Sequence, residues 1–298
     1  MPDISKINAL AIGSVSKVDG LAKASILDID GIAVPSAFLL DTYTGAAAGY
    51  SVRRLASSAT NLMRIREDSG DTETDIGYDS NGDLDTAAIA SHCGTANGFV
   101  VSWVDQSGNS NNAGQSTFSN QPKIYDGTAV ITEGTRPAIE FDKTNDQNLR
   151  LANTSYLTNT NNMGFFTVCK STSSPYSFTC AAVISNVNTY YVLLANQTAR
   201  VTYHGIQNTD TNDFNHNLFS VYADNASSDV KGYVNGSQLI STTPTSQTAQ
   251  QDLFIGRLGT LASTGWDGTI QEVIVWDTST KSNHIAIESD IDTYFSIP

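Results

Sequence analysis

Residues 99–109 read FVVSWVDQSGN, and this stretch decides the class of fold. Its first six residues are mostly β-branched or aromatic, which favours a strand. The five that follow are short, polar or glycine, and such clusters end strands and form tight turns. We expect Asp105, Ser107 and Asn109 to bond the local backbone and to fix a sharp bend after a buried strand. The alternative is that these three side chains line a ligand site.

The same alternation of apolar runs and turn residues recurs along the chain. The runs are rich in aromatic and β-branched residues, and clusters of Gly, Asn, Asp and Ser separate them. They cover residues 138–141, 165–169, 190–194, 219–222 and 270–276. In residues 63–66, Met63 and Ile65 alternate with Arg64 and Arg66. Val234-Asn235-Gly236-Ser237 is a strong hairpin signal. This pattern is typical of an all-β protein, and we predict one large antiparallel β-sandwich over residues 36–298.

Helix signals are confined to two short segments. Residues 85–90 read DTAAIA, which predicts a helix capped by Asp85 and ending near Gly94. Residues 282–295 predict a second helix. Its apolar face is expected to contain Ile287, Ile291 and Tyr294 or Phe295.

An eleven-residue repeat precedes the sandwich. Residues 4–14 read ISKINALAIGS, residues 15–25 read VSKVDGLAKAS, and residues 26–33 read ILDIDGIA. An eleven-residue period can indicate a right-handed helical coil. However, Asp-Gly in the second and third units is a turn signal, and the flanking Ile and Val prefer strands. We therefore predict a strand, a tight turn and a strand in each unit.

Three such units are too small to form a core of their own. We therefore expect residues 1–35 to be a β-repeat for attachment or oligomerisation, pairing with other copies of the chain, in a trimer, or with a larger assembly. The apolar positions assigned to this assembly are Ile7, Val18, Ile29, Leu10, Leu21 and Ile32. The alternative is an additional hairpin segment that folds onto the main domain.

Charge and hydropathy exclude several classes of partner. The net charge is −14, which repels nucleic acid. No apolar run reaches about 18 residues, so we expect no membrane-spanning helix. The N-terminus lacks a basic region followed by an apolar stretch, so we expect no signal peptide. Charged residues make up 15% of the chain, and such weakly charged polar surfaces are common on secreted, cell-surface and viral β proteins.

Neither cysteines nor histidines indicate a metal site or a cofactor, and we predict none. Cys93, Cys169 and Cys180 do not form a disulfide framework. Cys169 and Cys180 could face each other across a hairpin, or remain buried thiols. The four histidines, His92, His204, His216 and His284, have no metal-ligand spacing.

Residues 79–85, DSNGDLD, imitate a calcium-binding loop. Its glycine is at the fourth position rather than the sixth, and Ala90 stands where the bidentate Glu would be. We therefore predict a turn that leads into a helix cap.

Several strings resemble the catalytic domain of arabinofuranosidase B. They are YSVRRL at 50–55, IR at 65–66, DIG at 75–77, LDTAA at 84–88 and WVDQSGN at 103–109. Three later strings resemble the closing strands of laminin-G and other concanavalin-like domains. They are YVNG at 233–236, LFIG at 253–256 and WDGTIQEVIVW at 266–276. The resemblance implies a concanavalin-like jelly-roll β-sandwich.

The chemistry of that family is not evident in this sequence. Glycosidases of the usual kind need two carboxylates across the scissile bond. The resemblance implies a Glu nucleophile in the middle of the domain and an Asp acid after the Ile-Gly of a late strand. Residues 147–209 contain no Asp or Glu, and Ile255-Gly256 is followed by Arg257. No nucleophile-elbow string is present either. We therefore predict no catalytic residue and no enzymatic activity.

A sugar-binding site is predicted at Trp266 and Asp267, with Arg257 on the preceding strand end. Sugars bind by stacking on aromatic faces and through a few directed polar groups. The alternative is that Trp266 is a packed hairpin residue.

Sandwiches of this kind, preceded by repeats such as ISKIN, are similar to proteins of tailed bacteriophages. The resemblance implies a non-enzymatic virion structural protein of a fibre, tail or capsid decoration, assembled in the host cytoplasm. Its partners would be other virion proteins, and its lectin-like outer domain could bind host surface glycans. The alternatives are a glycoside hydrolase of the arabinofuranosidase type and a bacterial surface adhesion module, which the missing export signal disfavours.

Overall fold

The computed structural model describes most of the sandwich and short pieces of the repeat. The described residues are 38–154, 161–172, 182–186, 189–194, 200–203, 206–209, 215–244, 251–257 and 265–298, with two-residue strands between residues 6 and 33. Cys180, His204 and the Cys169–Cys180 question lie outside them, in whole or in part.

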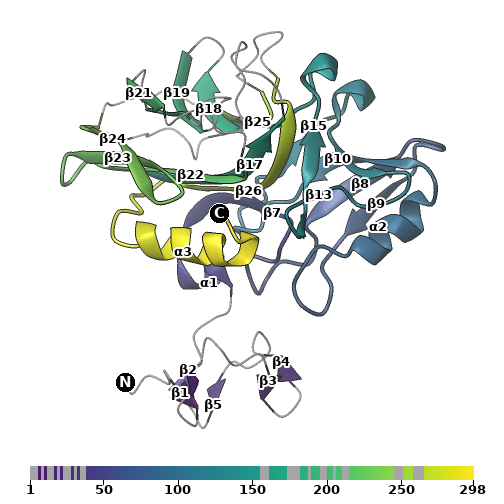
Figure 1. The fold of residues 1–298 in the computed structure, drawn as a ribbon, viewed down its shortest axis with the longest axis horizontal. Coiled ribbons are helices and arrows are strands. Elements are labelled where there is room, and N and C mark those ends of the chain that lie inside the picture. Colours follow the sequence, from purple (N-terminus) through teal and green to yellow (C-terminus); the bar gives the residue numbers. More distant parts are fainter. Residues whose placement is uncertain are drawn as a thin grey trace.

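Antiparallel pairing builds two facing layers (Figure 1). The strands of the first layer, in spatial order, are β24 (Ser237–Thr242), β23 (Asp229–Val234), β22 (Asn217–Asp224), β17 (Asn162–Ser171), β26 (Gly268–Trp276) and β7 (Ala46–Ser51). The strands of the second layer, from one edge to the other, are β9 (Glu73–Ile76), β8 (Met63–Glu67), β10 (Asn97–Trp103), β11 (Ala113–Gly114), β16 (Leu149–Thr154), β25 (Gln251–Ile255), β18 (Ala182–Asn186), β19 (Thr189–Leu194), β20 (Arg200–Tyr203) and β21 (Ile206–Thr209).

Two short strands join the layers. β12 (Lys123–Asp126) pairs with β10, and β15 (Ile139–Phe141) pairs with β12 on one side and with β26 on the other. A separate small hairpin, β13 (Thr132–Glu133) with β14 (Arg136–Pro137), lies between them in sequence. The predicted all-β antiparallel sandwich is therefore confirmed.

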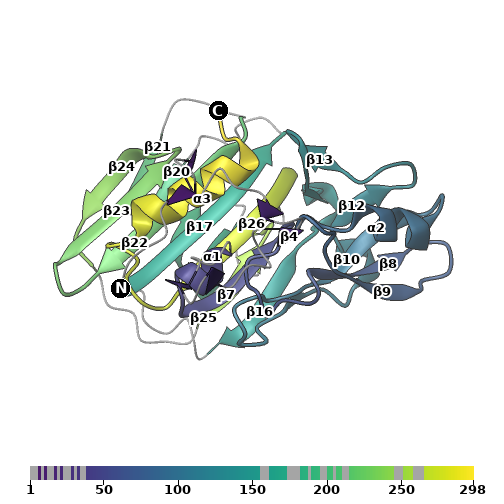
Figure 2. The ribbon, with the colours of Figure 1, turned by 90° about the horizontal axis from the view of Figure 1, so that it is seen from below.

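The centre of the first layer is buried on both faces. All nine residues of β26 are buried, because the facing strands cover one side and helix α3 (His284–Phe295) covers the other. Figure 2 shows α3 and the short helix α1 (Leu39–Thr42) lying over this layer. Ile287 and Ile291 of α3 are fully buried, as their spacing predicts.

A buried ion pair fastens α3 to the sheet. Arg53 donates from Nε to Glu272 of β26 at 2.9 Å and from Nη1 to Asp290 of α3 at 2.8 Å. Ser51 also donates to Glu272, at 2.6 Å. Glu272 is completely buried, and these partners offset the free-energy cost of burying its carboxylate.

The predicted local signals form where expected. Helix α2 (Thr86–Cys93) begins after Asp85, whose carboxylate accepts the N–H of Ala88 at 2.9 Å, and it ends at Gly94. The turn between β23 and β24 uses Asn235 and Gly236 with φ values of 48° and 74°. Both positive angles are those of a type I′ hairpin turn.

Each repeat unit is a hairpin with a two-residue loop. β1 (Lys6–Ile7) pairs with β2 (Leu10–Ala11), β3 (Lys17–Val18) with β4 (Leu21–Ala22), and β5 (Asp28–Ile29) with β6 (Ile32–Ala33). The two predicted strands of each unit are therefore confirmed, whereas residues 8–9, 19–20 and 30–31 between them lie outside the described part of the chain. The attachment role of residues 1–35 stays a prediction.

Candidate functional site

Pairing between β15 and β26 brings acidic residues together at one end of the sandwich. Glu140 lies opposite Thr269, and Phe141 lies opposite Gly268. Ile139 and Phe141 are buried, so the alternation of the strand leaves Glu140 exposed. Asp142 follows Phe141 and Asp267 precedes Gly268, so both aspartates lie just beyond the last β15–β26 pair, at the same end of the two strands. Residues about 125 positions apart in sequence therefore meet at one site.

A cavity of about 310 Å³ opens at this end. Its lining residues are Phe99, Lys123, Glu140, Phe141, Asp142, Asn145, Gln147, Thr172, Asp267 and Gly268. Three of these are carboxylates, two are amides, and Lys123 lies opposite Glu140 on β12. A small polar cavity with one aromatic edge is the kind of site that a sugar ring occupies.

The loop after β15 forms one wall of the cavity, and Asp142 holds its shape. The carboxylate of Asp142 accepts the N–H of Thr144 and the amide of Asn145, both at 2.7 Å. The N–H of Asp142 donates to Gln147 Oε1 at 2.8 Å. Asp142 is therefore a turn residue, and Glu140 and Asp267 are the carboxylates better placed for chemistry.

Asp267 is positioned by contacts on both sides. Its carboxylate lies 3.6 Å from Lys143 Nζ, and about a third of each side chain is exposed. Its backbone oxygen accepts the N–H of Thr172 at 2.8 Å. The next residue, Gly268, has φ 146°, and a Cβ there would lie 2.1 Å from the backbone oxygen of Lys170. Glycine is therefore required where β26 begins.

The three predicted sugar-binding residues have different surroundings. Asp267 lines the cavity. Trp266 is 1% exposed, so it presents no ring face for stacking, and it packs in the core as the alternative interpretation held. Arg257 forms an ion pair with Asp146 at 3.0 Å and supports the loop that walls the cavity. Sequence reasoning missed Glu140 and Lys123, although the alternation in residues 138–141 marks Glu140 as the exposed member.

The string DQSGN does not line the cavity but locks the turn after β10 onto β7. The carboxylate of Asp105 accepts N–H groups from Gly49 at 2.8 Å, Ser107 at 2.9 Å and Asn111 at 2.9 Å. Asn109 donates to the backbone oxygen of Ala46 at 2.9 Å. These contacts match the predicted structural role of the string.

Gln106 and Tyr50 complete this lock. Gln106 accepts the N–H of Leu55 at 2.7 Å and donates to the backbone oxygen of Arg53 at 2.9 Å. Tyr50 donates its hydroxyl to the backbone oxygen of Asn111. Burial, and then the nearby charge of Asp105, raise the pKa of the Tyr50 hydroxyl well above its usual range. The phenol therefore stays protonated as a donor.

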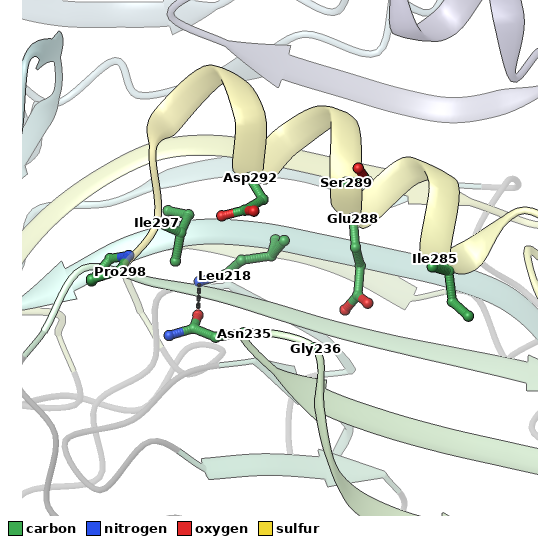
Figure 3. A pocket seen from close by; sticks show the side chains of 9 residues that line it. All are labelled: Leu218, Asn235, Gly236, Ile285, Glu288, Ser289, Asp292, Ile297 and Pro298. Atoms are coloured by element: carbon green, nitrogen blue, oxygen red, sulfur yellow. Dashed lines mark hydrogen bonds between the residues drawn. The ribbon is translucent and has the colours of Figure 1, made fainter.

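A second cavity, of about 300 Å³, lies between α3 and the β23–β24 turn (Figure 3). Its lining residues are Leu218, Asn235, Gly236, Ile285, Glu288, Ser289, Asp292, Ile297 and Pro298. Glu288 accepts the hydroxyl proton of Ser220 at 2.5 Å, and His284 Nε2 lies 2.9 Å from the same hydroxyl.

Ser220, His284 and Glu288 do not form a catalytic triad. In a triad, one imidazole nitrogen contacts the serine and the other contacts the acid. In this protein His284 Nδ1 has no partner, and Nε2 faces both the serine and, at 3.6 Å, the glutamate. Ser220 is completely buried, so no substrate reaches its hydroxyl. We interpret the three residues as a buried polar contact between α3 and β22.

No group of three or more His, Cys, Asp or Glu side chains in the part of the chain that the structure describes could hold a metal ion. No helix within it is long and apolar enough to cross a membrane.

Comparison with known proteins relates the chain to glycoside hydrolases by fold. No protein-family model matches, and no curated protein matches. A GH54 α-L-arabinofuranosidase soaked with a cyclic sulfate inhibitor has a TM-score of 0.65 and 16% identity over 85% of this chain. An arabinofuranosidase complexed with arabinofuranosyl-α-1,2-xylobiose has a TM-score of 0.60 and the same identity. The chain spans 64% of each of these proteins.

These comparisons correct the predicted function. The solved structures that share the fold over 85% of the chain are enzymes that act on carbohydrates, which contradicts the prediction of a non-enzymatic virion structural protein. That prediction relied on two family positions that lack carboxylates, whereas the folded chain gathers other carboxylates in one cavity. A location in the virion, with virion and host-glycan partners, is untested by these findings. At 16% identity the likeness establishes the fold alone, and the chain shares an antiparallel β-sandwich with these proteins.

Proposed function

We propose that this chain is a glycoside hydrolase that acts on arabinofuranosides, with the cavity between β15 and β26 as its active site. The proposal is supported by the fold that the chain shares with arabinofuranosidases, one of which was studied with 4-nitrophenyl α-L-arabinofuranoside. The observation that carries it is the convergence of Glu140, Asp142 and Asp267 on one polar cavity. The chain spans 64% of the length of those proteins, so arabinofuranosidase activity is proposed for it and not carried over from them.

Two carboxylates are sufficient for this reaction. One protonates the leaving oxygen, and the other either attacks the anomeric carbon or activates a water molecule. Glu140 lies on β15, and Asp267 immediately precedes the partner strand β26, so the sheet fixes the backbone at or next to both residues. A sheet holds catalytic groups more firmly than two free loops would.

Their surroundings suit different roles. Lys143 Nζ lies 3.6 Å from the Asp267 carboxylate and would hold it toward the reacting carbon, so we assign Asp267 as nucleophile or base. Glu140 is the other carboxylate that lines the cavity without holding the loop, so we assign it as proton donor. Lys123 lines the same cavity and can donate a hydrogen bond to a sugar hydroxyl.

This assignment departs from the family whose motifs the sequence resembles. Arg257 follows Ile255-Gly256 where the resemblance implies an acid, and it is engaged with Asp146. Residues 147–209 supply no carboxylate. The proposed acids are therefore not those of the family but neighbours contributed by β15 and by the start of β26.

The test is hydrolysis of 4-nitrophenyl α-L-arabinofuranoside by the full chain. Glu140→Gln and Asp267→Asn should each lower kcat/KM about 10²- to 10⁴-fold, the usual contribution of a positioned acid or base. Glu73→Gln is the matched control, since Glu73 is a surface carboxylate paired with Arg64 on β8, and its activity should equal that of the parent. Circular dichroism and thermal unfolding verify that each variant is folded.

Two results would contradict the proposal. One is a folded parent chain that releases no nitrophenol from aryl arabinofuranosides or from other aryl glycosides. The other is activity that survives both substitutions. If the activity is present, proton NMR of the first product reports retention or inversion at the anomeric carbon, and this distinguishes a nucleophile from a base at Asp267.

A further inference from the structure

The three N-terminal hairpins repeat one arrangement. Each forms its own two-stranded sheet, and the described strands of one hairpin pair with no strand of another. A two-stranded hairpin without further packing is marginally stable in water. The arrangement therefore calls for a partner.

The register divides each hairpin into an apolar face and a polar one. Directly opposed residues of an antiparallel pair share a face, and neighbours along the strand alternate between faces. The opposed pairs on the first face are Ile7 with Leu10, Val18 with Leu21 and Ile29 with Ile32. The opposed pairs on the second face are Lys6 with Ala11, Lys17 with Ala22 and Asp28 with Ala33. All three hairpins thus repeat the same pattern at eleven-residue intervals.

Charge indicates which part of the chain can meet another copy. Residues 1–35 contain three Lys and four Asp, a net charge of −1. The whole chain carries −14, so the remaining residues carry −13. Two sandwiches with that charge repel each other at low ionic strength. The nearly neutral hairpins are where two copies meet with least repulsion.

We propose that the hairpins of one chain associate with the hairpins of other copies of the same chain through the faces that carry Ile7, Val18 and Ile29. The partner must offer apolar faces with the same period, and a second copy offers three of them. Open strand edges, which otherwise invite unspecific pairing, would be covered by the same contact. This inference does not depend on the proposed glycosidase activity.

The experiment compares oligomeric states of full-length chains by sedimentation velocity. The parent should sediment as an oligomer at micromolar concentration. The variant Ile7→Ser/Val18→Ser/Ile29→Ser should dissociate to monomer, or shift its dissociation constant at least 100-fold. Lys6→Ser/Lys17→Ser/Asp28→Ser is the matched control on the opposite face and should keep the oligomer. Thermal unfolding of the sandwich should be the same in all three, because the substitutions lie outside it.

Salt provides a second readout. Association through apolar faces should persist from 0.1 to 1 M NaCl, because ionic strength screens only the charge repulsion between sandwiches. A monomeric parent, an oligomer that survives the apolar triple substitution, or equal loss of oligomer in the control variant would each overturn the proposal.

Discussion

The buried carboxylate of Asp105 should be among the most sensitive positions for stability. It accepts four hydrogen bonds: from the N–H groups of Gly49, Ser107 and Asn111, and from the hydroxyl of Ser107 at 2.8 Å. Asp105→Ala removes the acceptor for all of them. The N–H groups of Gly49 and Asn111 lie in buried surroundings, so water cannot replace the carboxylate there.

The expected loss follows from these two donors. A buried donor left without an acceptor costs about 1–3 kcal/mol, so Asp105→Ala should lower the free energy of unfolding by roughly 2–6 kcal/mol. Asp105→Asn keeps one oxygen and opposes its amide to one of the two N–H groups. It should therefore cost about half as much, roughly 1–3 kcal/mol.

Equilibrium urea unfolding, followed by far-ultraviolet circular dichroism, measures both values. Asp126→Ala is the control, since Asp126 accepts backbone N–H groups from Thr128 and Ala129 in an exposed turn, where water can take over. We expect it to cost about 0.5 kcal/mol or less. The reasoning fails if Asp105→Ala is no more destabilising than Asp126→Ala, or if Asp105→Asn is the worse of the two substitutions at this position.

Three further predictions concern single side chains in the sandwich. Hydrogen bonds from Ser69, Thr72 and Gly70 lower the pKa of the Glu67 carboxyl in the folded state. The ionised carboxylate therefore stabilises the fold above the unfolded pKa of about 4.3, and this stabilisation is lost as the pH falls. Glu67→Gln should be less stable than the parent in urea at pH 7, and the difference should shrink toward pH 3. Gly256→Ala should lower the free energy of unfolding by about 2–4 kcal/mol in the same assay, because φ is 79° and the added Cβ would lie 2.2 Å from the ring of Phe141. An unchanged free energy of unfolding would show that the ring can move. Glu272→Gln should lower the free energy of unfolding by about 3–5 kcal/mol, because the buried Arg53 guanidinium would keep only Asp290 as a charged partner. A loss under about 1 kcal/mol would mean that Asp290 is a sufficient partner.

Local signals in the sequence predict local structure well. Asp85 and Gly94 delimit α2 because a side-chain cap and a glycine act within one turn of the helix. Asn235-Gly236 forms its hairpin turn because both residues tolerate positive φ. The eleven-residue repeat gives three antiparallel strand pairs because each pair forms within a short local segment of the sequence.

The candidate site could not be located by the same means. It depends on β15 pairing with β26, and these strands are separated by about 125 residues of sequence. Periodicity shows that Glu140 faces away from the core, but not which strand lies beside it. Trp266 illustrates the converse error, because an aromatic beside an acid looks like a sugar platform until its burial is known.

The motif that carries the family resemblance also explains why function was misjudged. The side chains of the string DQSGN satisfy backbone groups of β7 that would otherwise be buried without partners. Such a string indicates the fold but not the positions of carboxylates in a cavity that distant parts of the chain build. The absence of acids at two family positions was therefore a sound observation but an insufficient basis for excluding catalysis, because the same sandwich brings Glu140 and Asp267 to one cavity. The Glu140→Gln and Asp267→Asn variants test whether those two carboxylates catalyse glycoside hydrolysis, whereas the Asp105 variants test only the scaffold that holds them.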